Sequence, residues 1–173
     1  AYLVPGAVET IRVFHEAGIK QAVVTGAKAN SRESVAQELK IRQYFTAIYG
    51  DGQKPANIRQ DMRENYLKPE QVAVVGDGTK DIEAALAAGV LAVGVAFTPE
   101  HRQKLINAGA DVIINGGFRN INAILESLEV VPVFRPSSRI ALSAKLYVMI
   151  IATICSAIAL VALDYPNWAA FLT

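Results

Sequence analysis

The sequence predicts an α/β fold in which a parallel β-sheet carries helices on both faces and is followed by one transmembrane helix. Two patterns carry this prediction: short apolar runs alternate with helical patterns up to residue 129, and an uncharged, mostly apolar stretch follows at 146–163. The composition agrees, because 52% of the 173 residues are hydrophobic and 19% are charged. In average soluble domains, about 45–50% of the residues are hydrophobic and about 25% are charged. This balance excludes a disordered chain.

The five predicted strands are short apolar runs bounded by turn residues, which is typical of strands buried in a parallel sheet. The clearest run is VAVV, and the weakest is the second. The runs cover residues 21–25, 47–49, 72–75, 91–95 and 112–114. Strands that alternate with helices at this spacing form parallel sheets covered on both faces.

The predicted helices lie between these strands. The first covers residues 5–17 and stops at Gly18. Asn30 and Glu33 have the spacing of a capping box and predict the start of a helix that runs through Leu39. The remaining helices are expected at 56–67, at 82–88, after Pro99 and at 121–128.

The chain is predicted to divide at a proline-containing linker. Residues 1–129 form the α/β domain, residues 130–139 the linker, residues 140–164 the transmembrane helix and residues 165–173 an interfacial tail. The run at 146–163 is long enough to approach the thickness of a bilayer, and basic residues precede it while aromatic residues follow it. The alternative is a central helix of a soluble bundle.

This division predicts a single-pass membrane protein whose partner is the lipid bilayer. The positive-inside rule places the α/β domain on the cytoplasmic side, or the equivalent stromal or matrix side, and the short C-terminal tail on the opposite side. The net charge is only +1, so no nucleic-acid partner is expected. The single cysteine, Cys155, excludes an internal disulfide, and the sequence contains no zinc-binding cluster.

Candidate anion-binding residues follow the first two strands, at the sheet edge where α/β proteins bind ligands. Thr25, Gly26 and Ala27 combine a hydroxyl group with backbone N–H groups that can approach an anion. Lys54, held by the proline that follows it, can place a positive charge against a phosphate. The alternatives are a threonine that closes a strand and an exposed loop lysine.

Candidate cation ligands follow the strongest strand. Asp77 and Asp81 lie four residues apart in GDGTKD, between this strand and the next helix. Carboxylates at such a place suit Mg²⁺, which takes one or two of them together with water and phosphate oxygens. The alternative is that Asp77 forms a turn and Asp81 belongs to the first turn of the helix. Neither histidine, His15 or His101, is predicted to act in catalysis.

Taken together, these three motifs resemble the haloacid dehalogenase superfamily, particularly its phosphoglycolate-phosphatase-like members. The resemblance runs from Val4-Pro5-Gly6 to about Leu128 and includes VAVVGDGTKDIEAALAAGV and AGADVII. It implies a Rossmann-like sheet and a Mg²⁺-dependent phosphoryl-transfer site. Thr25 and Lys54 would be catalytic, and with Gly26 and Ala27 they would bind the phosphate. Asp77 would ligate the metal, supported by Asp81.

The sequence departs from this family at the motif DxDx[TV], which supplies the nucleophilic aspartate at the end of the first strand. No aspartate precedes Asp51, so the first strand and the cap are expected to be absent from the domain. In the family, that strand lies between the two assigned here to 21–25 and 72–75. Three explanations are open: a segment upstream of Ala1 supplies it, another strand fills the slot, or the sheet closes up. The first is favoured.

Two functions are therefore expected. One is a membrane-anchored phosphatase for a small phosphorylated substrate, which is active only if a further N-terminal segment supplies the aspartate; the 173 residues alone would be inactive. The alternative is a non-catalytic accessory subunit whose helix docks into a larger membrane complex. Ala152, Ser156 and Ala159 form a face of small residues that would allow close packing against other transmembrane subunits.

Overall fold

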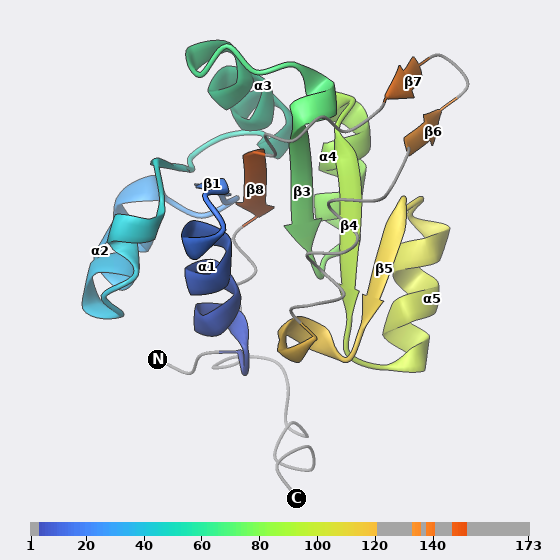
Figure 1. Ribbon diagram of the computed structural model, residues 1–173, viewed down its shortest axis with the longest axis horizontal. Coiled ribbons are helices and arrows are strands. Elements are labelled where there is room, and N and C mark those ends of the chain that lie inside the picture. The colour runs from blue at the N-terminus through green and yellow to red at the C-terminus, as the bar shows by residue number, and fades with distance from the viewer. Residues whose placement is uncertain (1–3, 121–132, 136–137, 141–146, 152–173) are drawn as a thin grey trace, which may run out of the picture.

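The computed structural model describes residues 4–120, 133–135, 138–140 and 147–151. Six strands form one sheet in the order β2–β1–β8–β3–β4–β5, and all the neighbouring pairs are parallel (Figure 1). The strands are β1 (Lys20–Val24), β2 (Ala47–Tyr49), β3 (Val72–Gly76), β4 (Leu91–Ala96), β5 (Val112–Asn115) and β8 (Tyr147–Ile151). The predicted α/β class and parallel sheet are confirmed.

Helices cover both faces of this sheet. They are α1 (Ala7–Glu16), α2 (Ala29–Glu38), α3 (Lys54–Glu64), α4 (Thr79–Ala88) and α5 (Pro99–Asn107). In Figure 1, α1 lies in front of the sheet and α4 lies behind it. Alternate residues of β3 divide between two cores. Ala73 and Val75 pack with α1 and α2, whereas Val72 and Val74 pack with α3, α4 and α5.

The five strands predicted from the first 120 residues agree with the structure to within one residue at each end. All residues of β3 and β4 are buried, as expected for strands covered on both faces. The helix boundaries differ more. Helix α3 begins at Lys54 and not at residue 56, and α4 begins at Thr79 and not at residue 82. The helix predicted at 121–128 lies outside the described residues.

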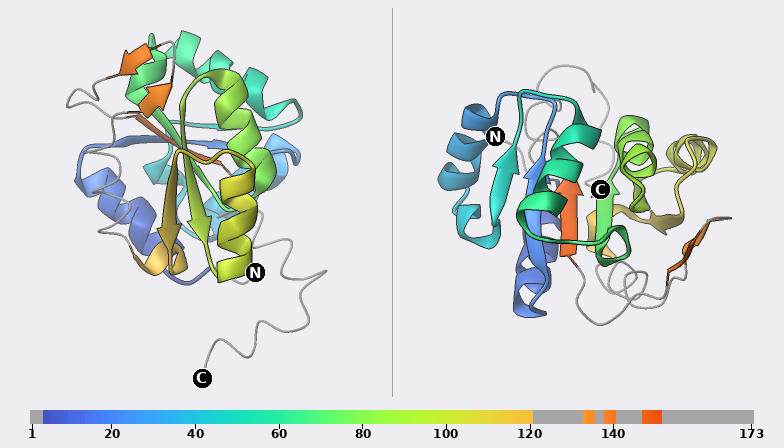
Figure 2. Two further views of the ribbon diagram at one scale, coloured as in Figure 1. Left: turned by 90° about the vertical axis from the view of Figure 1, so that its right-hand side faces the viewer. Right: turned by 90° about the horizontal axis from the view of Figure 1, so that it is seen from above.

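The prediction of a transmembrane helix over 140–164 is wrong for residues 147–151. They form β8, in the middle of the sheet, where Met149 is in register with Ala22 of β1 and Val74 of β3 (Figure 2). An apolar run has no periodicity that separates a buried strand from a buried helix, and Val, Ile and Tyr favour strands. No helix in the described parts of the chain is long and apolar enough to cross a membrane. Residues 141–146 and 152–164 lie outside the described residues.

Strand β8 also answers the question of the empty slot. Three explanations were open for the missing strand, and the structure agrees with the second, in which another strand lies between β1 and β3. The favoured explanation, a segment upstream of Ala1, stays a prediction, because the structure begins at Ala1. The physical reason for the position of β8 is that β1 and β3 each have backbone N–H and C=O groups on the edges that face the slot. These buried groups need partners, and β8 provides them.

The predicted linker at 130–139 contains regular structure in its described residues. Strands β6 (Val133–Arg135) and β7 (Ser138–Ile140) pair antiparallel. The pair forms a small separate sheet, and its last residue, Ile140, was predicted to begin the transmembrane helix. The predicted tail at 165–173 lies outside the described residues.

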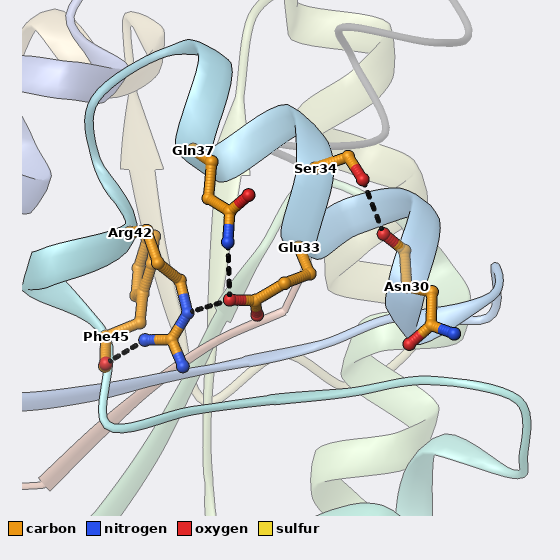
Figure 3. Close-up of polar contacts among 6 residues, drawn as sticks. All are labelled: Asn30, Glu33, Ser34, Gln37, Arg42 and Phe45. Atoms are coloured by element: carbon orange, nitrogen blue, oxygen red, sulfur yellow. Dashed lines mark hydrogen bonds and ion pairs between the residues drawn. The ribbon is translucent and has the colours of Figure 1, made fainter.

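The capping box predicted for α2 is absent. The helix begins at Ala29, so its N-cap is Lys28, two residues before Asn30, and Lys28 makes no side-chain capping bond. Asn30 therefore lies inside the helix, where its carbonyl oxygen accepts a hydrogen bond from Ser34 Oγ (3.1 Å, Figure 3). Glu33 instead accepts hydrogen bonds from Gln37 Nε2 (3.5 Å) and Arg42 Nε (2.6 Å). Glu33, in the middle of α2, thus joins this helix to the turn that follows it.

Candidate active site

The predicted site residues gather at the carboxyl ends of neighbouring parallel strands. Thr25 directly follows β1, Lys54 begins α3 after β2, and Asp77 directly follows β3. The sheet order places the ends of β2, β1, β8 and β3 next to one another. Ligands bind at this edge of open α/β sheets, because loops and helix N-termini converge there.

Lys54 and Asp81 make the contact that joins the second and third motifs. Lys54 Nζ donates to Asp81 Oδ1 over 2.5 Å, between the N-termini of α3 and α4. The Asp81 side chain is 4% exposed and that of Lys54 is 25% exposed, so the ammonium group reaches from a buried carboxylate towards solvent. Asp81 thereby neutralises part of the charge of Lys54 and fixes where the rest is presented.

The first motif lies beside this pair. Thr25 is fully buried, and its Oγ1 accepts a hydrogen bond from the Ala27 N–H group (3.1 Å). A hydroxyl group that accepts in this way keeps its own hydrogen for donation. A Cβ atom added to Gly26 would lie 3.9 Å from Lys54 Cε, so the lysine side chain passes over this glycine. The structure thus brings Thr25, Gly26, Ala27, Lys54 and Asp81 together.

A contact that the sequence analysis missed holds this loop in place. Asp51, in the loop between β2 and α3, has a φ of 58° and accepts a hydrogen bond from the Ala29 N–H group through Oδ2 (3.0 Å). Its own N–H group donates to the Ala27 carbonyl oxygen (3.1 Å). The N-terminus of α2 is therefore capped from another loop. The Gly50-Asp51-Gly52 sequence signals a turn, but not which helix its aspartate caps.

The loop after β3 is shaped around Asp81. Asp81 Oδ2 accepts a hydrogen bond from the Gly78 N–H group (3.0 Å). A Cβ atom on Gly76 or Gly78 would lie 2.7 or 2.9 Å from Asp81 Oδ2, so only glycine fits at either place without displacing the carboxylate. Asp81 also lies in the first turn of α4, which is the alternative role that the sequence predicts for it. It has this helical position and the contact to Lys54 at the same time.

The oxygen donors of this loop fit a hard cation bound chiefly through Asp77. Both Asp81 oxygens already accept hydrogen bonds, one from Lys54 and one from Gly78, so Asp81 is placed to support the loop. Asp77 is partly exposed at the strand end. In the part of the chain that the structure describes, no three His, Cys, Asp or Glu side chains are grouped to hold a metal ion. Mg²⁺ binds commonly through one or two carboxylates plus water and phosphate.

The histidines differ in their surroundings. His15 is exposed on α1, with its ring tilted against Tyr44 at a centroid distance of 5.2 Å. His101, near the start of α5, reaches the carbonyl oxygen of Asp77 with Nε2 (2.7 Å). This contact has no signal in the sequence, because it depends on how α5 packs beside the β3–α4 loop.

Comparison with known proteins agrees with this geometry. Residues 1–95 match the family model described as haloacid dehalogenase-like hydrolase. The chain is 26% identical over 133 residues to a phosphoglycolate phosphatase of Vibrio vulnificus. This alignment covers 73% of this chain and 58% of that protein. It is 27% identical over 159 residues to a phosphoglycolate phosphatase of Pseudomonas fluorescens, covering 85% and 58%.

Solved structures show the same fold. A predicted phosphoglycolate phosphatase from Haemophilus somnus superposes with a TM-score of 0.63 at 25% identity, covering 72% of this chain and 57% of that one. A predicted phosphatase from Clostridium acetobutylicum superposes with a TM-score of 0.64 at 24% identity, covering 70% and 59%. The chain therefore spans less than two thirds of the length of these relatives. Since the family model matches more than half of its residues, the chain belongs to the haloacid dehalogenase-like hydrolases.

Proposed function

We propose that this chain provides the phosphate-binding and cation-binding half of a Mg²⁺-dependent phosphatase for small phosphomonoesters. The observation that carries the proposal is the Lys54–Asp81 contact beside Thr25 and Gly26. It gathers a cationic group, a hydroxyl donor, backbone N–H groups and carboxylates within one strand-end site. These are the groups that bind a phosphate dianion together with a divalent cation.

Each residue has a distinct part in the proposal. The Thr25 hydroxyl and the Gly26 N–H group bind the phosphate oxygens, and Lys54 offsets their charge. The Ala27 N–H group, which donates to Thr25 Oγ1, orients that hydroxyl within the phosphate-binding loop. Asp77 binds Mg²⁺, and Asp81 holds both Lys54 and the Asp77 loop. A bound Mg²⁺ would polarise the phosphoryl group and neutralise developing charge. The names of the relatives favour phosphoglycolate, or another small acidic phosphomonoester, as the substrate.

Hydrolysis further requires a carboxylate nucleophile at the carboxyl end of the strand between β1 and β3. Strand β8 occupies this place, and its residues Tyr147–Ile151 include no carboxylate. We therefore propose that turnover depends on an aspartate contributed by a segment upstream of Ala1, as the family resemblance implies, and that this segment would take the place of β8 between β1 and β3. Without such a contribution, the same site would bind phosphate but not cleave it, which corresponds to the non-catalytic accessory role.

Binding and turnover are tested separately. Titration of the full chain with inorganic phosphate in the presence of Mg²⁺, followed by calorimetry, is expected to show binding. Lys54→Ala should weaken it about tenfold or more, which corresponds to about 1.4 kcal/mol. Lys68→Ala is the matched control, since Lys68 is exposed and lies before the amino end of β3, at the opposite edge of the sheet. Circular dichroism checks that both variants remain folded.

Thr25→Val provides a second variant, because it removes the hydroxyl group and leaves the Lys54–Asp81 pair intact. Equal phosphate affinity in the wild type, Lys54→Ala and Thr25→Val would refute the proposed site. Phosphate release from phosphoglycolate or p-nitrophenyl phosphate, measured on the native protein with any residues that precede Ala1, then separates the two roles. Turnover lost in Asp77→Asn supports the phosphatase, whereas phosphate binding without turnover supports the accessory role.

A further inference from the structure

The imidazole ring of His101 is held from three directions. His101 is the third residue of α5, and its backbone N–H group donates to Oγ1 of Thr98, the N-cap residue (3.1 Å). The Phe97 N–H group donates to His101 Nδ1 (3.3 Å). The Phe97 ring stacks on the imidazole at a centroid distance of 5.8 Å and an interplanar angle of 11°. These contacts fix both the position of the ring and the direction of its second nitrogen.

That second nitrogen points at the proposed cation site. His101 Nε2 lies 2.7 Å from the carbonyl oxygen of Asp77. A carbonyl oxygen can only accept, so Nε2 carries the hydrogen and donates. Because Nδ1 accepts from Phe97, the neutral tautomer with hydrogen on Nε2 satisfies both bonds. The loop between β4 and α5 is thereby tied to the loop between β3 and α4.

The Asp77 carbonyl group and the Gly78 N–H group belong to one peptide unit. His101 Nε2 donates to the oxygen of this unit, and Asp81 Oδ2 accepts from its N–H group (3.0 Å). A planar peptide group bonded by side chains at both of its polar atoms cannot rotate without breaking both bonds. Its orientation sets the backbone dihedral ψ of Asp77, and so limits where the Asp77 carboxylate is presented.

We infer that His101 is a positioning residue which, together with Asp81, fixes the Asp77–Gly78 peptide so that the Asp77 carboxylate is prearranged to bind a divalent cation. This inference rests on the proposed function, in which Asp77 is the cation ligand. His101 itself does not touch the cation. Groups that orient metal ligands without contacting the metal commonly alter metal affinity about 10–100-fold when they are replaced.

The test uses the full chain and Mn²⁺ alone, whose paramagnetic resonance signal reports the free ion. His101→Phe keeps a ring that can stack on Phe97 and removes the donor. It should raise the Mn²⁺ dissociation constant about tenfold, the lower end of the range for such groups, while the metal-free protein stays folded with a thermal midpoint lowered by only a few degrees. His101→Gln retains an N–H donor near the place of Nε2 and should restore most of the affinity.

His15→Phe is the matched control. It removes the chain's other histidine, which is exposed on α1, and so measures adventitious binding of Mn²⁺ to imidazole. Wild-type affinity in His101→Phe, or an equal loss in His101→Phe and His101→Gln, would overturn the positioning role alone. If Asp77→Asn binds Mn²⁺ as the wild type does, or if the wild type binds none, the proposed cation site itself fails.

Discussion

Strands β3 and β8 are parallel neighbours at the centre of the sheet, but they reach this place by different routes along the chain. β3 is followed within fifteen residues by its other neighbour, β4, and α4 connects the two. β8 pairs only with β1 and β3, from which it is separated by most of the domain. Figure 2 shows β8 seated between strands that belong to earlier βα units.

This difference shows that the two halves of the sheet are joined by a strand that is distant from both in the sequence. β1 and β2 form one pair, and β3, β4 and β5 form another group, with β8 as the only described strand between them. Thr25 and Asp77 therefore directly follow the two strands, β1 and β3, that pair with β8. The Lys54–Asp81 contact crosses the same junction, from α3 to α4.

The largest expected effect comes from breaking β8. Met149→Pro removes an N–H group from a central strand, where proline is not tolerated, and should lower the urea midpoint more than either of the changes below. Urea unfolding followed by circular dichroism measures the loss. Ala157→Pro is the control, since it lies in the same apolar run outside β8. A helix across the whole run would be damaged by both substitutions, so equal losses would contradict the central role of β8.

An intermediate effect is expected at the end of β3. The added methyl group of Gly76→Ala would meet the Asp81 carboxylate at 2.7 Å, and the carboxylate is held by Lys54 and Gly78. Such overpacking should cost about 1–3 kcal/mol. Gly26→Ala, at the loop after β1, has its nearest contact at 3.9 Å and should cost less. A larger loss in Gly26→Ala than in Gly76→Ala would refute the claim that Asp81 is rigidly held.

The smallest effect is expected at the edge strand β2, which pairs with β1 and not with β8. Tyr49 Oη donates to Glu64 Oε2 (2.6 Å). Burial, together with hydrogen bonds to Glu64 and Asp61, raises the pKa of Tyr49 above its usual 10.0. The hydrogen bond from Tyr49, followed by that from Gln60, lowers the pKa of Glu64 below 4.5. The Tyr49–Glu64 pair therefore stabilises the fold fully between pH 4.5 and pH 10.0.

The direction in which pH changes the stability follows from the difference in pKa between the folded and unfolded states. The contribution of Glu64 is lost as the pH falls below 4.5 through its lowered folded pKa. That of Tyr49 is lost as the pH rises above 10.0 towards its raised folded pKa. Tyr49→Phe should lower the melting temperature at pH 7 by roughly 2–4 °C, and the difference from the wild type should shrink outside this window. Tyr66→Phe, at a side chain 92% exposed, is the control and should change little.

The residues that the sequence analysis located correctly share a simple property. Each strand of the first 120 residues lies between turn residues, so its length is bounded locally. Thr25, Lys54 and Asp81 directly follow such strands or begin the helices after them, and strand ends meet in a parallel sheet. Asp51 and His101 were missed because each bonds a backbone group of a different βα unit. No sequence spacing encodes which helix Asp51 caps or which loop His101 reaches.

Local sequence by itself determined the five bounded strands, their alternation with helices and the strand ends that carry the polar motifs, because turn residues and short apolar runs restrict the backbone locally. Tertiary structure decided the state of residues 147–151. Their apolar side chains suit a buried strand or a buried helix equally in pattern. Only the unpaired edges of β1 and β3, assembled from residues more than 70 positions away in the chain, select the strand, since buried backbone groups must be hydrogen-bonded.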